Sequence, residues 1–174
     1  MKISAYVGTS LDGFIARKDG DFSWLSQFAN DEAVAAYNEF IARIDAIVIG
    51  RGTFEEVLKF PEWHYDKPVF VLSSTINELP DAAKDKATIL SMPPREVLGH
   101  LVREGFSNIY VDGGTVIQSF LTEGLIDELI VATVPIIIGN GIPLFGHGET
   151  DISFRHIKTI VATNGLVRSF YEKA

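Results

Sequence analysis

The fold turns on one stretch, Ile109-Tyr-Val-Asp-Gly-Gly-Thr-Val-Ile-Gln-Ser-Phe-Leu121. It begins with apolar, strand-forming residues, reaches an Asp-Gly-Gly turn and continues with the apolar spacing of a helix. A strand that ends at two glycines and becomes a helix leaves backbone N–H groups free at the helix start, where the positive end of the helix dipole also lies. Such a junction can bind an anion such as phosphate, although Gly-Gly also serves simply to make a tight turn.

The composition of the 174 residues is typical of one folded domain, expected to span residues 1–174. The net charge of −8 argues against a nucleic-acid partner and against a basic membrane-surface role, but leaves room for a local anion site. The absence of cysteine excludes disulfides and thiol chemistry and fits a reducing cytoplasm. The longest apolar run, 129–138, is too short to span a bilayer, and the N-terminus resembles a first strand rather than a signal peptide.

The spacing of apolar residues predicts strands that alternate with helices along most of the chain. Expected strands are 3–8, 45–50, 68–74, 87–91, 109–112 and 126–134, and expected helices are 31–43, 51–58, 93–104 and 114–121. Asp31 and Thr53 are the expected caps of the first two helices. Two alternating runs, 153–162 and 166–171, flank Thr163-Asn-Gly165, which is typical of a hairpin. The pattern predicts a three-layer α/β fold, with helices on both faces of a mostly parallel sheet and a C-terminal antiparallel hairpin.

Glycine or polar residues follow four of the expected strands, at Gly8-Thr9, Gly50-Arg51, Ser73-Ser74 and Asp112-Gly113-Gly114. In open parallel sheets, ligands bind outside the carboxyl ends of the strands. The two glycine–helix junctions can hold a pyrophosphate from two sides, while Arg51 and the serines can bind a further phosphate. The coincidence of these features predicts a dinucleotide site.

Three motifs resemble, in order and spacing, the cofactor-site motifs of the dihydrofolate reductase superfamily: Ile47-Val-Ile-Gly-Arg-Gly-Thr-Phe54, Val71-Leu-Ser-Ser74 and Val111-Asp-Gly-Gly-Thr-Val-Ile117. Three further features are similar to the branch that includes the reductase domain of bifunctional riboflavin biosynthesis proteins. These are Ser10-Leu-Asp-Gly13, the acidic residue before the glycine pair, and Val134-Pro-Ile-Ile-Ile-Gly-Asn-Gly-Ile-Pro-Leu-Phe145. The resemblance covers nearly the whole chain.

The resemblance implies NADPH as the cofactor and assigns its parts to four groups of residues. Gly50, Arg51 and Thr53 would hold phosphates, with Arg51 on the 2′-phosphate, and Leu72, Ser73 and Ser74 would line the adenosine end. Gly113, Gly114, Thr115, Val116 and Ile117 would wrap the pyrophosphate. Gly8, Thr9 and Ile15 would lie near the nicotinamide, with the 17–23 loop folded over it.

On the substrate side, the resemblance makes Asp112 a substrate-facing carboxylate and the best candidate for a catalytic group that orients a proton-donating water. Asp12 and Trp24 are the other candidate substrate-binding residues. Each has a structural alternative: Asp112 can cap the following helix, Asp12 can form a turn and Trp24 can pack in the core. Arg51 can likewise pair with Glu55 on the surface of a helix.

The expected function is NADPH-dependent reduction of a pyrimidine or pterin-like heterocycle. The most similar activity is that of 5-amino-6-(5-phosphoribosylamino)uracil reductase in riboflavin biosynthesis. A dihydrofolate reductase is the enzymatic alternative, but the position of its substrate carboxylate holds Ala29, and only a shift reaches Asp31 or Glu32. Two classes without catalysis also fit the sequence, namely an NADPH-binding protein without turnover and a purely structural domain.

The four histidines, His64, His100, His147 and His156, are scattered without metal-ligand spacing, so no metal is expected. The resemblance also implies a homodimer. The apolar run 136–138 is either a subunit contact or part of the core.

Overall fold

The computed structural model describes residues 1–146 and 150–174, so His147 lies outside the described residues. The elements, in chain order, are β1 (Lys2–Thr9), β2 (Phe14–Ala16), α1 (Ser23–Ser26), α2 (Asp31–Ile41), β3 (Ala46–Gly50), α3 (Arg51–Val57), β4 (Val69–Leu72), η1 (Asp81–Ala83), β5 (Ala87–Leu90), α4 (Pro94–Arg103), β6 (Asn108–Asp112), α5 (Gly114–Thr122), β7 (Glu128–Thr133), β8 (Ile142–Pro143), β9 (Phe154–Val161) and β10 (Val167–Lys173). Each strand and helix expected from the sequence is present.

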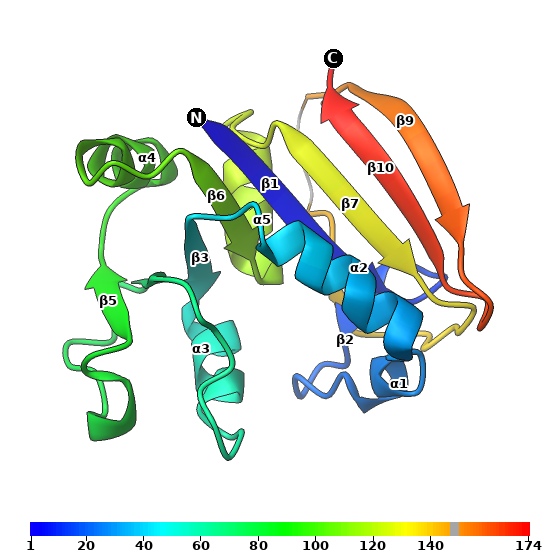
Figure 1. Ribbon diagram of the computed structural model, residues 1–174, viewed down its shortest axis with the longest axis horizontal. Coiled ribbons are helices and arrows are strands. Elements are labelled where there is room, and N and C mark those ends of the chain that lie inside the picture. Colours follow the sequence, from blue (N-terminus) through cyan, green and yellow to red (C-terminus); the bar gives the residue numbers. More distant parts are fainter. Residues whose placement is uncertain (147–149) are drawn as a thin grey trace.

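The main sheet has the strand order β5-β4-β3-β6-β1-β7-β10-β9. The strands from β5 to β7 are parallel, and β10 pairs antiparallel with both β7 and β9. Figure 1 shows α2 crossing one face of this sheet and α5 lying against the opposite face. The fold class predicted from the sequence is therefore confirmed, including the C-terminal antiparallel pair.

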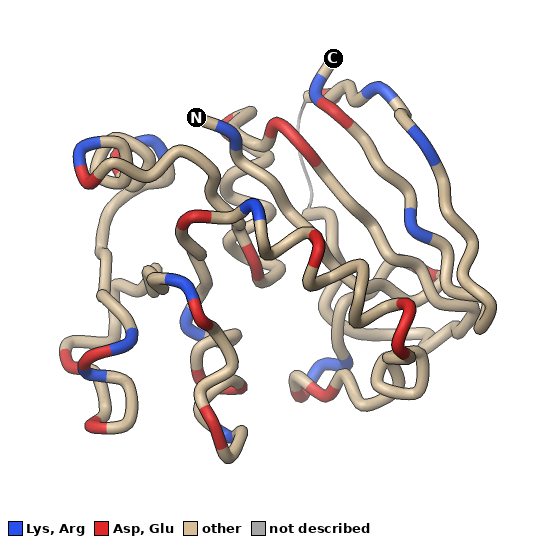
Figure 2. Tube along the Cα trace, in the orientation of Figure 1, with Lys and Arg blue, Asp and Glu red and all other residues tan. Residues whose placement is uncertain are grey.

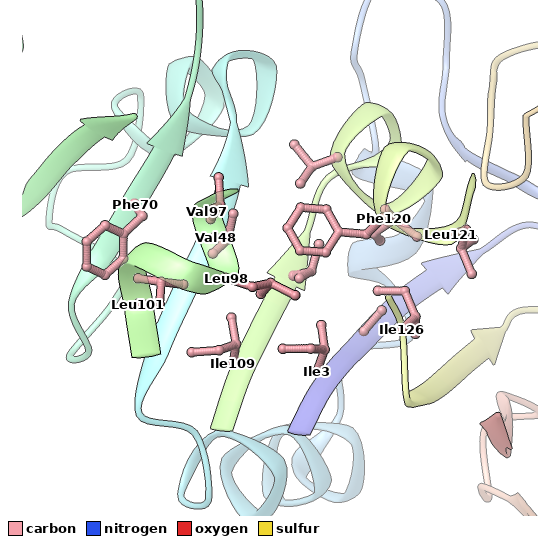
Figure 3. Close-up of a cluster of buried hydrophobic side chains, with 14 of the residues drawn as sticks. Ile3, Val48, Phe70, Val97, Leu98, Leu101, Ile109, Phe120, Leu121 and Ile126 are labelled. Atoms are coloured by element: carbon pink, nitrogen blue, oxygen red, sulfur yellow. The ribbon is translucent and has the colours of Figure 1, made fainter. Parts of the chain in front are cut away.

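Two apolar layers hold the helices to the sheet. On one face, Phe40 of α2 and Phe54 of α3 pack on Ile47 and Val69. On the other face, α4 and α5 pack on the alternate residues of the same strands. Figure 3 shows this second layer, in which Leu98 and Phe120 lie against Ile3, Val48 and Ile109. Both faces of the central strands are buried, which is why their sequences are apolar throughout rather than alternating.

Several local features differ from expectation. Asn30, not Asp31, caps α2, because its side-chain oxygen accepts from the N–H of Ala33 at 2.9 Å. Thr53 lies inside α3, whose N-cap residue is Gly50. The strands β2 and β8 and the short helix α1 lie in segments where no strand or helix was expected. β2 and β8 pair with each other over a long sequence separation, so no local pattern indicates them.

The two glycine junctions are packed against each other. Gly113 has a φ of 93°, a conformation that favours glycine, and a Cβ at this position would overlap the hydroxyl of Thr53. A Cβ on Gly50 would lie 2.9 Å from Cγ2 of Val116 in α5. The starts of α3 and α5 therefore approach each other more closely than side chains at these glycines would allow.

We expect Gly113→Ala to destabilise the protein by about 1–3 kcal/mol, because alanine meets both an unfavourable φ and the side chain of Thr53. Urea unfolding measures this as a fall in the transition midpoint. Gly52→Ala is the matched control, since a Cβ there meets no atom within 4 Å. In a helix that change should be neutral or stabilising by up to about 1 kcal/mol. Equal midpoints for Gly113→Ala and the wild type would contradict the packing described.

Candidate functional site

The residues predicted to bind a cofactor meet at one edge of the sheet. Registers place Leu72 of β4 beside Gly50 of β3, and Ile49 of β3 beside Asp112 of β6. The carboxyl ends of three adjacent strands, and the residues that follow them, therefore lie in one row. This is the edge at which parallel α/β sheets bind their ligands.

Two helices begin side by side at this edge. Gly50 precedes α3 and Gly113 precedes α5. Because glycine has no side chain, neither N-cap residue can cap its own helix, so the first-turn N–H groups keep their capacity to donate. A Cβ on Gly52 would meet no atom within 4 Å, so the start of α3 is open to a ligand. The donors and the open approach fit a diphosphate group.

Local donors matter here because the chain is acidic overall, with a net charge of −8. Figure 2 shows Lys and Arg interspersed with Asp and Glu along the chain. The one basic residue in the first turn of α3 is Arg51, whose Nη1 lies 3.6 Å from Oε1 of Glu55. Both side chains are more than half exposed, so the pair is worth little and can be exchanged for another anion. The surface pair expected from the helical spacing is thus present, and it leaves the guanidinium accessible.

A hollow of about 380 Å³ adjoins the row of strand ends. Its lining combines residues at the ends of β4 and β5: Leu72, Ser73, Ser74, Leu90, Ser91 and Met92. The first three were predicted for the adenosine end, and the last three were missed, although Ser91 is the last residue of an expected strand. Ser73 shapes the rim, since its Oγ accepts from the N–H groups of Thr75 and Ile76 at 3.1 and 3.0 Å. A second hollow, of about 490 Å³, lies beside β5 and contains none of the predicted residues.

Apolar side chains cover the start of α5. A Cβ on Gly114 would lie 2.6 Å from Cδ1 of Ile15 in β2 and 3.6 Å from Cγ2 of Ile142 in β8. The backbone of Leu144 donates to the carbonyl of Gly13 at 3.0 Å, which joins the segments that carry these two isoleucines. Ile15 therefore lies next to Gly114, its place near the nicotinamide stays a prediction, and Ile142 was missed.

The end of β1 lies under the loop that follows it. A Cβ on Gly8 would lie 2.5 Å from Cδ2 of Leu25, and the buried Thr9 shares a 3.2 Å hydroxyl contact with Thr133. The 17–23 loop reaches α3, where a Cβ on Gly20 would be 3.5 Å from Oε1 of Glu56. Residues 17–25 therefore contact both the end of β1, through Leu25 of α1, and the first helix of the predicted cofactor site, through Gly20.

Asp112 is the central carboxyl group of the site. Its Oδ1 accepts from the N–H of Gly113 at 2.8 Å, and the hydroxyl of Tyr65 lies 3.4 Å from its Oδ2. Burial raises the pKa of Asp112 above its ordinary value, against the opposing effect of the Gly113 N–H. Its hydrogen bonds come from Gly113 and Tyr65 and not from the first turn of α5, so helix capping does not account for the carboxylate.

Asp12 and Trp24 have contacts that are structural. The carboxylate of Asp12 accepts from the N–H groups of Ile138 and Gly139 at 3.2 and 2.8 Å, and so ties two loops together. Hydrogen bonds, first from Ser10 and then from these backbone groups, lower the pKa of Asp12. Trp24 is buried in a cluster with Ala132, Val134, Ala162 and Leu166. The substrate-binding roles of Asp12 and Trp24 stay predictions.

The helical carboxylate considered for a dihydrofolate reductase points elsewhere. Glu32 lies 3.8 Å from the buried Arg168 of β10, and its Oε2 accepts from the N–H of Thr163 at 3.3 Å. It therefore fastens α2 to the C-terminal hairpin. Arg168 was missed because its sequence neighbours do not distinguish it from an exposed hairpin arginine.

Two further expectations concern metals and membranes. Within residues 1–146 and 150–174, no three His, Cys, Asp or Glu side chains gather closely enough to hold a metal ion. Across the same residues, no helix is long and apolar enough to cross a membrane.

The strand order and the layers are those of the dihydrofolate-reductase-like fold. The chain belongs to the RibD C-terminal domain family, whose model matches residues 1–167. This confirms the branch of the superfamily that the motifs indicated.

Three proteins illustrate the similarity. The uncharacterized protein YwjB of Bacillus subtilis is 35% identical, and the alignment covers 99% of this chain and 98% of YwjB. A crystal structure from Shewanella sp. PV-4, of a protein provisionally assigned to riboflavin biosynthesis, is 39% identical with a TM-score of 0.94, covering 100% and 99% of the two chains. The deaminase/5-amino-6-(5-phosphoribosylamino)uracil reductase of Thermotoga maritima has a TM-score of 0.77 at 16% identity. That match covers 99% of this chain and 56% of the bifunctional protein, and it shows the shared fold.

We expect Asp112→Asn to make the protein more stable than the wild type at neutral and alkaline pH. The folded-state pKa of Asp112 is raised, so the native state binds more protons than the unfolded state between the ordinary and the raised pKa. Stability therefore falls as pH rises through the folded pKa, and asparagine removes that loss. Thermal unfolding over a pH series measures the difference, which should disappear in acid.

Asp12→Asn is the matched control with the opposite sign. Because the pKa of Asp12 is lowered, its carboxylate stabilises the fold above its ordinary pKa, and this contribution is lost as pH falls through the lowered value. The variant should be less stable than the wild type at neutral pH. If both variants changed stability in the same direction at every pH, the environment assigned to Asp112 would be wrong.

Proposed function

We propose that this protein is an NADPH-dependent reductase that transfers a hydride to a pyrimidine or pterin-like heterocycle. One observation carries the proposal: two glycine-capped helix starts and a serine-lined hollow meet at the carboxyl edge of the sheet. Membership of the RibD C-terminal domain family supports the same class of activity.

Each part of the cofactor has a matching part of the protein. The N–H groups at the starts of α3 and α5 would bind the diphosphate, and Arg51 would bind the 2′-phosphate. The hollow between the ends of β4 and β5 would take the adenosine. Ile15, Ile142 and Leu25 would exclude water from the nicotinamide end.

When bound, the reduced nicotinamide would supply the hydride, and the protein would supply position and a proton. Asp112 lies at the junction of the cofactor and substrate sides, with a carboxyl group whose raised pKa favours the protonated form. It can therefore hold a proton at Oδ2 and pass it to a substrate atom, directly or through water.

The proposed substrate class follows the family and one structural fact. The Thermotoga maritima relative is named for reduction of an aminouracil. Glu32 is engaged with Arg168 and Thr163 rather than presented to a ligand, which argues against the pterin-binding carboxylate of a dihydrofolate reductase. We therefore favour 5-amino-6-(5-phosphoribosylamino)uracil, or a close analogue of it, as the substrate.

We also propose a cytoplasmic homodimer. Ile136 and Ile138 pack against the Trp24 cluster, whereas Ile137 is 70% exposed. Val161, on the edge strand β9, is 68% exposed. A second copy of the chain would cover such side chains.

We expect Arg51→Ala to weaken NADPH binding about tenfold to a hundredfold and to leave NADH binding unchanged, because one charge-assisted contact to the 2′-phosphate is lost. Quenching of the fluorescence of Trp24 and Trp63 measures both affinities. Arg155→Ala is the matched control, since Arg155 is an exposed arginine paired with Glu172 on the hairpin. Equal weakening of NADPH and NADH would place the 2′-phosphate elsewhere.

Substrate assays decide between the aminouracil reductase and the competing functions. We expect the fall in NADPH absorbance to depend on the aminouracil substrate and to be absent with dihydrofolate. Turnover of dihydrofolate alone would identify a dihydrofolate reductase instead. Tight NADPH binding without turnover of either compound would favour a binding protein and sink the proposed reaction.

A further inference from the structure

Tyrosines from several elements pack beside Asp112, and of these only Tyr110 belongs to a stretch that the sequence singled out. Tyr110 precedes Asp112 on β6, Tyr37 comes from α2 and Tyr6 from β1. The rings of Tyr37 and Tyr110 are 6.5 Å apart, and Tyr110 donates to the carbonyl of Tyr6 at 2.9 Å. Tyr65 enters this group from the irregular segment between α3 and β4 and places its hydroxyl 3.4 Å from Oδ2 of Asp112.

Tyr65 is held in place by packing rather than by regular secondary structure. It is 9% exposed and belongs to the apolar layer under α2 and α3. The rings of Trp63 and His64 meet it nearly at right angles, at 6.1 and 5.3 Å. Three aromatic residues in sequence thus fix the direction of a single hydroxyl, and that hydroxyl points at the candidate acid.

We propose that Tyr65 is a positioning residue, which together with the Gly113 N–H fixes both oxygens of Asp112 so that its carboxyl group faces the substrate as a proton donor. The inference rests on the proposed reductase function and deepens it. The Gly113 N–H holds Oδ1 at 2.8 Å and the Tyr65 hydroxyl holds Oδ2. With both oxygens held, rotation of the carboxyl plane is restricted, and only the remaining lone-pair directions are open to a ligand.

The groups that face Asp112 support this role. They are Tyr37 of α2, Tyr110 of β6, and Tyr65 and His64 of the irregular segment, whose Asp66 acts on Tyr37. Of these, His64 is the one that can carry positive charge, and it is exposed. Burial without a fixed cation raises the pKa of Asp112, so the acid form persists above the ordinary range of an aspartate.

The geometry also defines a class of substrate. A protonated Asp112 would give one proton to a hydrogen-bond acceptor, while the neighbouring carbon would receive a hydride, which the reduced nicotinamide of the proposed function would supply in becoming oxidised. The double bond between that carbon and the acceptor becomes single, and Asp112 is left as a carboxylate that regains its proton from water. The substrate therefore carries a C=N or C=O bond whose nitrogen or oxygen faces Asp112.

The test is Tyr65→Phe, which keeps the ring and its packing and removes only the hydroxyl. The Tyr65 hydroxyl stabilises the carboxylate form of Asp112, so its loss should raise the Asp112 pKa further. Carbon-13 NMR of protein labelled at aspartate Cγ follows this titration without any need for catalysis. Tyr171→Phe is the matched control. Tyr171 lies in the apolar layer on the opposite face of the sheet from Tyr65, with its ring against His156, so this change should leave the Asp112 titration unchanged.

In the holoenzyme, Tyr65→Phe should lower kcat by about tenfold to a hundredfold with little change in KM for NADPH, because the acid is no longer held in one orientation. The alkaline limb of the pH profile should move to higher pH with the NMR midpoint. The inference would be overturned if Tyr65→Phe left the NMR midpoint of Asp112 unchanged. It would also be overturned if that midpoint shifted while the alkaline limb of the kcat profile stayed in place. If the wild type did not bind NADPH, the proposed reductase function would be refuted. That outcome is independent of the Asp112 titration.

Discussion

The close approach of the two glycine junctions is the constraint on which the rest of the structure depends. β3 and β6 are neighbours and parallel, so the helices that follow them must both begin at the same edge of the sheet. Side chains at Gly50 and Gly113 would hold these helices apart, since they would meet Val116 and Thr53. Because glycine has no side chain, the two helix starts can lie close together. Their N–H groups and dipoles then act on the same place, and a site for negative charge arises from main-chain atoms alone.

The strand order then separates the site into two parts. β1 pairs with β6 from Lys2–Asn108 to Ser4–Tyr110, whereas it continues beside β7 as far as Thr9–Thr133. The ends of β1 and β6 therefore part, as Figure 1 shows. Asp112 and the tyrosines lie at this parting, while the hollow between β4 and β5 lies on the other side of the glycine junctions. A ligand that extends along the strand ends can reach both parts.

The sequence predicted the main-chain part of the site far better than the side-chain part. Glycines between a strand and a helix are recognisable locally, so Gly50, Gly113 and the serines after β4 could be found without a structure. Tyr65 could not, because it stands in an irregular segment and acquires meaning only through a contact 47 positions away. The same holds for Asp12, whose local turn signal concealed its bonds to Ile138 and Gly139. The β2–β8 pair has two or three residues a strand, too few for periodicity to register.

The two parts of the site also differ in their effect on the stability of the fold. The helices α3 and α5 pack on the sheet whether or not a ligand binds, so an anion site at their starts does not lower the stability of the fold. Asp112 is different, since a carboxyl group placed among tyrosines with a raised pKa opposes folding at neutral pH. An asparagine or a serine could accept the Gly113 N–H equally well without that penalty. A residue that satisfies local geometry no better than its neutral substitutes, and that weakens the fold, is most simply explained by a chemical task. By this reasoning, Asp112 indicates function more strongly than the glycines that follow it.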